Sequence, residues 1–369
     1  MKTNYRKFEY PLFLLVLFLT VFGLVNMFSA STVYALRVFN DASYLLVRQI
    51  VFIVLGIIAC IITSFVHEKF IDKMSFIVYL SSAILVFVTV FIGTMSRGSV
   101  RWFTFRGLTF QPSEIMKLAV IVFIASFVKK NFYSLDENYN MYKLFMIGFL
   151  PAAVVSINNL STGIIIMSIT VLMIYVVSTK KLVYAVILIF IILVYIFAYP
   201  IALGVENVGL LRSYQLNRIF AWKNPMEYQD LSYQTLQGLY AIGSGGIFGR
   251  GFGESIQKTI MPEAQNDMVF TIICEELGFV GAMILLILYI LILFRIFYIT
   301  YRQKDVFKFM ICFGIAIHFA LQIILNLCVV MNLMPNTGIT LPFVSYGGTS
   351  LIILYIEIGL ILNFAKSVE

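Results

Sequence analysis

Apolar stretches close to the length of a membrane-spanning helix follow one another through almost the whole of this chain. A helix needs about 20 mostly apolar residues to cross the hydrocarbon core of a bilayer. Only 12% of the 369 residues are charged, whereas soluble domains carry about 25%. We therefore predict an all-α integral membrane protein, a single polytopic domain over residues 1–369 with about ten transmembrane helices. These cover roughly residues 10–30, 45–66, 74–94, 113–129, 143–158, 161–178, 182–203, 267–294, 308–333 and 347–365.

The placement of lysine and arginine predicts the orientation in the membrane, because short cytoplasmic loops carry an excess of both. If the N-terminus is cytoplasmic, the cytoplasmic loops hold most of these residues, and the others fall mainly in two long loops, where the rule is weakest. We therefore predict that both termini are cytoplasmic. Residues 204–266, between predicted helices 7 and 8, then form a large extracytoplasmic loop on the same side as segments 95–112 and 334–349.

Asp267 stands where this long polar loop meets an apolar helix. A carboxylate at the mouth of a membrane helix is costly to desolvate, which favours a functional role. The alternative is a helix N-cap, for which aspartate is well suited. Its position alone leaves both interpretations open.

The segment that leads into predicted helix 4 combines three basic residues with a carboxylate. Arg97 and Arg101 precede Gln111-Pro112-Ser113-Glu114, and Lys117 follows within the helix. Ser113 is a candidate cap, and Glu114 and Lys117 share a helix face at this spacing. The basic groups could bind an anionic lipid headgroup. Alternatively, Glu114 and Lys117 neutralise one another in a structural pair.

The long loop holds Arg212 and Arg218, then an apolar repeat at helical spacing around Gln237, which predicts a helix along the membrane surface. A glycine-rich run over 243–253 follows. Its backbone N–H groups could approach an anion, or the run could be a flexible hinge.

Proline and glycine interrupt residues 334–350, which include Ser345 and Tyr346, near membrane depth. Irregular backbone survives there only when it is packed in protein or lines a water-filled cavity. The segment is a candidate wall of an active cleft, or a buried re-entrant turn. Glu275 and Glu276 are expected about 12–14 Å deeper along the helix than Asp267, in structural roles.

The cysteines and histidines give no sign of a metal site. The four cysteines lie inside apolar runs without a CxxC spacing, and the two histidines are isolated. We expect no disulfide framework and no certain cofactor, although a bound divalent cation could assist chemistry at a phosphate group.

Four segments together resemble the SEDS family of bacterial envelope proteins, of the RodA/FtsW/SpoVE type. The resemblance covers nearly the whole chain, and its most specific parts are Gln111-Pro112-Ser113-Glu114 with Lys117, Ala241 to Gly246, Pro262-Glu263 with Asp267 and Glu275 to Gly278, and Thr337-Gly338 with Ser345 to Gly348. One departure is Asn159, where the family usually carries an aspartate. Asparagine keeps an oxygen acceptor but not the charge.

The resemblance implies a peptidoglycan glycosyltransferase in the bacterial cytoplasmic membrane that polymerises lipid II. It implies Asp267 as the catalytic carboxylate, and a class B penicillin-binding protein as partner, with no role for nucleic acid. The candidate substrate-binding residues are Arg101, Gln111, Ser113, Glu114, Lys117, Asn159, Arg212, Arg218, Gln237, Ser345 and Tyr346.

Two other classes of function also fit a polytopic chain. A flippase or transporter of lipid-linked precursors needs a polar pathway that opens on both sides of the membrane. A scaffold that recruits a synthase would leave the polar segments without a chemical role. Because the polar segments gather on one predicted side, the pattern favours an enzyme.

Overall fold

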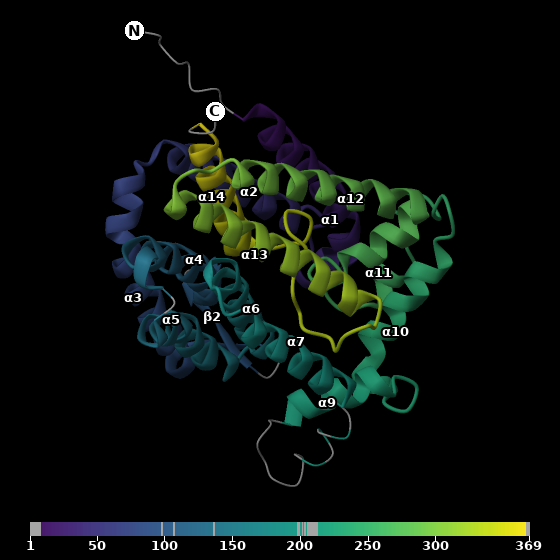
Figure 1. Ribbon diagram of the computed structural model, residues 1–369. Helices are drawn as coiled ribbons and strands as arrows, with labels where there is room; N and C mark the ends of the chain where they lie inside the picture. The colour runs from purple at the N-terminus through teal and green to yellow at the C-terminus, as the bar shows by residue number, and fades with distance from the viewer. Residues whose placement is uncertain are drawn as a thin grey trace.

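The computed structural model describes residues 9–366, apart from 97–98, 106–107, 136, 198–199, 201, 203 and 205–212. In this part of the chain a helix corresponds to each of the ten predicted spans (Figure 1). These helices are α1 (Tyr10–Phe39), α2 (Tyr44–Phe65), α3 (Glu68–Ile92), α4 (Pro112–Lys130), α5 (Asn138–Ser156), α6 (Leu160–Val177), α7 (Lys181–Ile196), α12 (Val269–Tyr301), α13 (Val306–Val330) and α14 (Gly348–Ala365).

Seven of the described helices are both long and apolar enough to cross a membrane, namely α1, α2, α3, α6, α12, α13 and α14. The other three fall short for local reasons. Helix α4 carries charged residues at both ends, α5 begins with polar turns, and α7 has 16 residues. Other helices of the bundle cover much of α4, whose buried face is apolar apart from a few polar groups.

Ion pairs and hydrogen bonds join several helix ends at one end of the bundle, which we call the terminal face. Arg295 of α12 pairs with Glu9 just before α1, at 2.9 Å. Gln303, just beyond α12, donates to the carbonyl of Phe364 in α14, at 3.1 Å. The start of α1 and the end of α14 therefore lie at the same end of the bundle, as the predicted topology requires (Figure 1).

The opposite end, which we call the loop face, carries the short elements. Helices α9 (Ser213–Lys223), α10 (Gln229–Ser244) and α11 (Gln257–Ile260) belong to the long loop. Strands β1 (Thr94–Ser96), β2 (Ser99–Phe105) and β3 (Leu108–Phe110) form an antiparallel sheet. The prediction of a plain loop over 95–112 was incomplete, because β-branched and aromatic residues there favour paired strands.

Helix α12 is broken at Gly278, whose φ of +65° is outside the helical range. The glycine run passes directly against this break. A Cβ atom on Gly245 would lie 1.9 Å from the Cys274 carbonyl oxygen, and one on Gly249 would lie 2.2 Å from that of Glu276. Only glycine permits such an approach of two backbones.

Hydrogen bonds from the glycine run satisfy the backbone N–H and C=O groups that lose their helical partners at the break. Carbonyls of the first helical piece accept from Arg250 and Gly251, and N–H groups of the second piece donate to Gly246 and Ile247. The Arg250 and Gly251 N–H groups are therefore not available to an anion. The anion-binding interpretation is wrong for this part of the run.

Glu275 and Glu276 contact the long loop, while their depth in the membrane relative to Asp267 stays a prediction. Glu275 accepts hydrogen bonds from the Ser255 hydroxyl and from the N–H groups of Ile256 and Gln257 in the long loop. Glu276 pairs with Lys258 of the same loop at 2.9 Å and accepts from Ser29 of α1 at 2.6 Å. Both carboxylates anchor the long loop at the break, which is the structural role that was expected.

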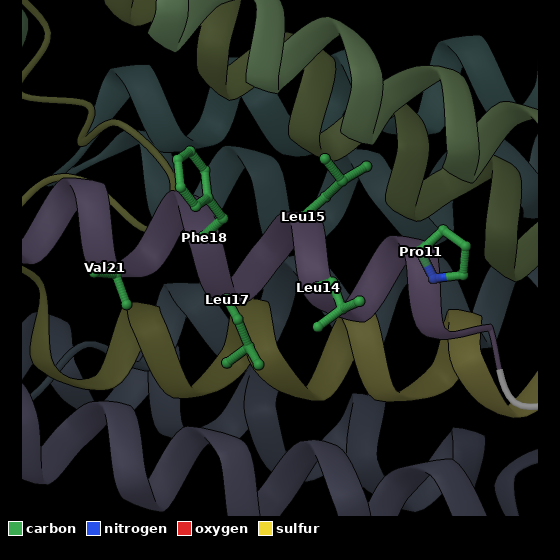
Figure 2. Close-up of a pocket in the computed structure, with 6 residues that line it drawn as sticks. All are labelled: Pro11, Leu14, Leu15, Leu17, Phe18 and Val21. Atoms are coloured by element: carbon green, nitrogen blue, oxygen red, sulfur yellow. The ribbon is translucent and has the colours of Figure 1, made fainter.

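The outer surface of α1 shows what the bundle presents to lipid. A shallow, open and almost wholly apolar hollow lies there, and its lining residues all belong to α1 (Figure 2). Leu14, Phe18 and Val21 are 58 to 60% exposed. Such a surface suits hydrocarbon and offers nothing to a sugar or phosphate group. The lining residues are Pro11, Leu14, Leu15, Leu17, Phe18 and Val21.

Candidate active site

Asp267 is buried at the start of α12, with 2% of its surface exposed. Its Oδ1 atom accepts a hydrogen bond from Gln234 Nε2 at 3.2 Å, and its backbone carbonyl accepts from Asn326 Nδ2 at 2.8 Å. Met268 occupies the N-cap position of α12, and its side chain makes no capping hydrogen bond. Asp267 is therefore not the N-cap residue, and the functional interpretation of its carboxylate stays a prediction.

Gln234 reaches Asp267 from α10. This helix packs on α12 through small and apolar residues, since Ala241 is buried and a Cβ on Gly238 would meet Thr271 at 3.3 Å. Gln234 Oε1 accepts from Asn336 Nδ2 at 3.1 Å. A helix of the long loop, the Asp267 segment and the segment between α13 and α14 thus meet through side-chain amides.

The second half of the irregular segment over 331–347, from Ile339 to Ser345, is packed in protein, which is one of the two surroundings expected for such backbone. Asn326 and Gln322, one turn apart on α13, donate to the carbonyls of Ile339 at 2.7 Å and Thr340 at 3.1 Å. Tyr289 of α12 donates to the Pro342 carbonyl at 2.7 Å. These side chains supply the hydrogen bonds that a helix would otherwise make internally.

Ser345 and Tyr346 lie beside the Asp267 segment. The Tyr346 N–H donates to the carbonyl of Gln265, two residues before Asp267, at 2.8 Å. Gln49 of α2 donates to the Ser345 carbonyl at 3.3 Å. Burial raises the pKa of Tyr346 above that of an ordinary tyrosine.

The start of α4 adjoins the start of α14, because the Gln111 N–H donates to Thr349 Oγ1 at 3.4 Å. Ser113 lies inside the helix and accepts from Gln111 Nε2 at 3.1 Å, so the prediction of Ser113 as the cap is wrong. Lys117 pairs with Glu114 at 3.0 Å, and both are buried. The predicted pair is therefore present.

The structure places the other predicted residues less closely. Asn159 caps α6 by accepting from the Thr162 N–H at 3.3 Å, a local structural role. Gln237 is half-buried on α10, about one turn beyond Gln234, and Arg218 is half-buried on α9. Only the backbone of Arg101 is described, in β2, while Arg97 and Arg212 lie outside the described residues. The side chains of Arg97 and Arg101 are therefore outside the described part of the chain, and their approach to Lys117 stays a prediction.

Metal ligands do not gather in the part of the chain that the structure describes. There, no three side chains of His, Cys, Asp or Glu lie close enough to hold a metal ion.

Four amide residues of the site did not appear among the predicted residues, and a usable signal for two of them was present in the sequence. Gln49 and Asn326 are amides within otherwise apolar helices, where a polar group is costly and needs a partner. Gln234 and Asn336 occupy polar segments, where nothing in the sequence distinguishes them from their neighbours.

Comparison with known proteins decides the family. The model of the FtsW/RodA/SpoVE family, described as cell cycle proteins, matches residues 10–369. The chain belongs to this family.

Two curated members of the FtsW/RodA/SpoVE family resemble the chain over nearly its whole length. A probable peptidoglycan glycosyltransferase FtsW from Trichlorobacter lovleyi is 32% identical, over 100% of this chain and 96% of the relative. Stage V sporulation protein E from Bacillus subtilis is 33% identical, over 96% of each chain.

Solved structures share the fold of this family member. RodA from Thermus thermophilus, a rod shape determining protein, aligns with a TM-score of 0.69 at 23% identity, over 99% of this chain and 98% of RodA. A chain of a peptidoglycan synthase complex aligns with a TM-score of 0.81 at 23% identity, over 98% of both chains.

Proposed function

We propose that this chain is a peptidoglycan glycosyltransferase that polymerises lipid II at the extracytoplasmic face of the bacterial cytoplasmic membrane. The observation that carries the proposal is the buried Asp267 side chain at the loop face, whose carboxylate accepts from Gln234 and whose backbone carbonyl accepts from Asn326. Membership of a family with curated glycosyltransferases supports it. In this proposal the loop face is extracytoplasmic, both termini are cytoplasmic, and the membrane domain is a single unit.

The reaction joins two lipid-linked sugars. The 4-hydroxyl oxygen of one sugar attacks the anomeric carbon of the other, and Asp267 takes the hydroxyl proton as general base. The bond from the anomeric carbon to the diphosphate oxygen breaks, and undecaprenyl diphosphate leaves with the bonding electrons. Diphosphate is a good leaving group, so a second carboxylate is not needed as an acid.

Cationic residues stabilise the departing diphosphate in this proposal. We assign the binding of the diphosphate to Lys117, Arg101, Arg212 and Arg218. Lys117 already pairs with Glu114 at 3.0 Å, so binding of substrate would share its charge between two anions. The polar residues Gln111, Ser113, Gln237, Ser345 and Tyr346 are assigned to the surrounding sugar and headgroup, and Asn159 to a more distant, structural place.

Reconstitution with purified lipid II tests the function. We expect glycan polymer from the chain in vesicles or detergent. Inversion of the lipid headgroup without polymer would instead identify a flippase. Because one likeness is to a chain of a peptidoglycan synthase complex, we further propose a crosslinking partner, a class B penicillin-binding protein. Co-purification from native membranes tests that partnership.

A further inference from the structure

We propose that Gln234 is a positioning residue that fixes the orientation of the Asp267 carboxylate, and that Asn336 in turn fixes the amide of Gln234. This inference rests on the proposed function of Asp267 as general base. It adds two residues, from α10 and from the segment between α13 and α14, to the machinery of the reaction.

Hydrogen-bond chemistry sets the direction of this amide relay. Asn336 Nδ2 donates to Gln234 Oε1 at 3.1 Å, and Gln234 Nε2 donates to Asp267 Oδ1 at 3.2 Å. A flipped Gln234 amide would place its oxygen against an ionised carboxylate oxygen, and neither atom can donate. It would also turn its NH₂ group toward that of Asn336. The observed direction is therefore the one that satisfies both contacts.

The relay also distinguishes the two carboxylate oxygens. Oδ1 takes the Gln234 amide, whereas Oδ2 faces Gly338, where an added Cβ would lie 3.8 Å away. Gly338 has φ +69° and no side chain, so only its backbone borders the carboxylate on this side. Loss of the Gln234 contact would let the carboxylate rotate away from the orientation that this hydrogen bond fixes.

A purely structural Gln234 is the competing interpretation. Its Nε2 atom also lies 3.4 Å from the Pro262 carbonyl, so it could simply hold α10 against the loop. The two interpretations differ in the kinetic quantity that they affect. A positioning residue acts on the maximal rate, because misalignment of a reacting group slows the chemical step without loosening the substrate.

The first test replaces Gln234 with methionine, which has a similar shape but makes no comparable hydrogen bonds. We expect Gln234→Met to lower the polymerisation rate at saturating lipid II about 10- to 100-fold, with the half-saturating concentration within about threefold of wild type. Gln229→Met, at an exposed position of the same helix, is the matched control and should keep the wild-type rate. If Gln234→Met does not fold, Gln234→Asn, whose shorter side chain cannot span both partners, should show the same loss.

The second test is a double-mutant cycle. Asn336→Leu alone should lower the maximal rate roughly 3- to 10-fold, the effect of one hydrogen bond, and should add nothing in the Gln234→Met background. Independent, additive losses would overturn the relay. A normal maximal rate in folded Gln234→Met, or a loss confined to the half-saturating concentration, would overturn the positioning role. Absence of polymer from the wild-type chain would refute the proposed function itself, so the two failures are distinguishable.

Discussion

At the scale of single residues, the site depends on the side-chain amides that surround the buried Asp267. Asp267 was predictable because a carboxylate at a membrane-helix entrance is conspicuous in so apolar a chain. Gln234 and Asn336 were not, because amides in polar loops are common and only the fold brings them together. Lys117 and Glu114 are a clearer case, since their helical spacing within an apolar segment predicted a buried ion pair, and the structure confirms it.

Replacement of the Asp267 carboxylate by an amide should abolish polymerisation and leave the fold intact. The substituted side chain would keep an oxygen that can accept from Gln234, but an amide cannot take up a proton at neutral pH. We expect Asp267→Asn to lose at least about 100-fold in rate, measured as glycan polymer formed from lipid II. A folded Asp267→Asn protein with near-normal yield would refute the general base assignment.

The buried ion pair allows stability and substrate binding to be separated. Lys117→Met leaves Glu114 uncompensated and should cost about 3–5 kcal/mol of stability. Adding Glu114→Gln should restore most of the thermal stability, because no charge is then stranded. If Lys117 binds the diphosphate, the double variant stays stable but polymerises poorly. A stable double variant with normal activity would show that the pair is only structural.

At the scale of elements, the break in α12 joins the glycine run to the helix that follows Asp267. The sequence predicted one continuous helix here, because apolar periodicity does not record a single residue with positive φ. The sequence showed the glycine run but not its role, because the backbone of α12 against which it packs lies about 30 residues further along the chain. The strands over 94–110 were missed although β-branched and aromatic residues favour them, because β1 and β3 have only three residues each and show no clear alternation.

A side chain at the break should be poorly tolerated. A Cβ on Gly278 would lie 2.3 Å from the Gly249 nitrogen, at φ +65°. Gly278→Ala should therefore cost about 1–3 kcal/mol or more, seen as a lower melting temperature in detergent. Gly243→Ala is the matched control, because nothing lies within 4 Å of the added Cβ and alanine favours the helix. Equal melting temperatures for the two variants would contradict this account of the break.

At the scale of the whole molecule, hydrophobic stretches of membrane length predicted nearly every helix of the bundle. That success has a simple physical basis, because in lipid each spanning segment must satisfy its own backbone. The contacts between helices followed less directly, since apolar faces resemble one another in sequence. The start of α1 and the end of α14 lie together at the terminal face, as an even number of spans requires, and the side of the membrane on which they lie stays a prediction.

Two exposed positions test that orientation. Tyr133, between α4 and α5, is fully exposed near the terminal face, and Phe248, in the glycine run, is 81% exposed at the loop face. In intact cells, an impermeant maleimide should label Phe248→Cys and spare Tyr133→Cys. After permeabilisation both should react, while the native cysteines serve as the background in the unsubstituted chain. The reverse pattern would invert the proposed topology.

The amide contacts around Asp267 also set a time order for biogenesis. Gln234 meets Asn336, which is 102 residues later, and Gln49 meets Ser345, which is 296 residues later. A growing chain inserts its N-terminal helices first, so these partners are absent while most of the protein is already in the membrane. The relay from Asn336 through Gln234 to the carboxylate is therefore complete only when synthesis is nearly finished. Nascent or truncated chains that end before the segment over 331–347 would sit in the bilayer without an assembled reaction centre, and so could not consume lipid II prematurely.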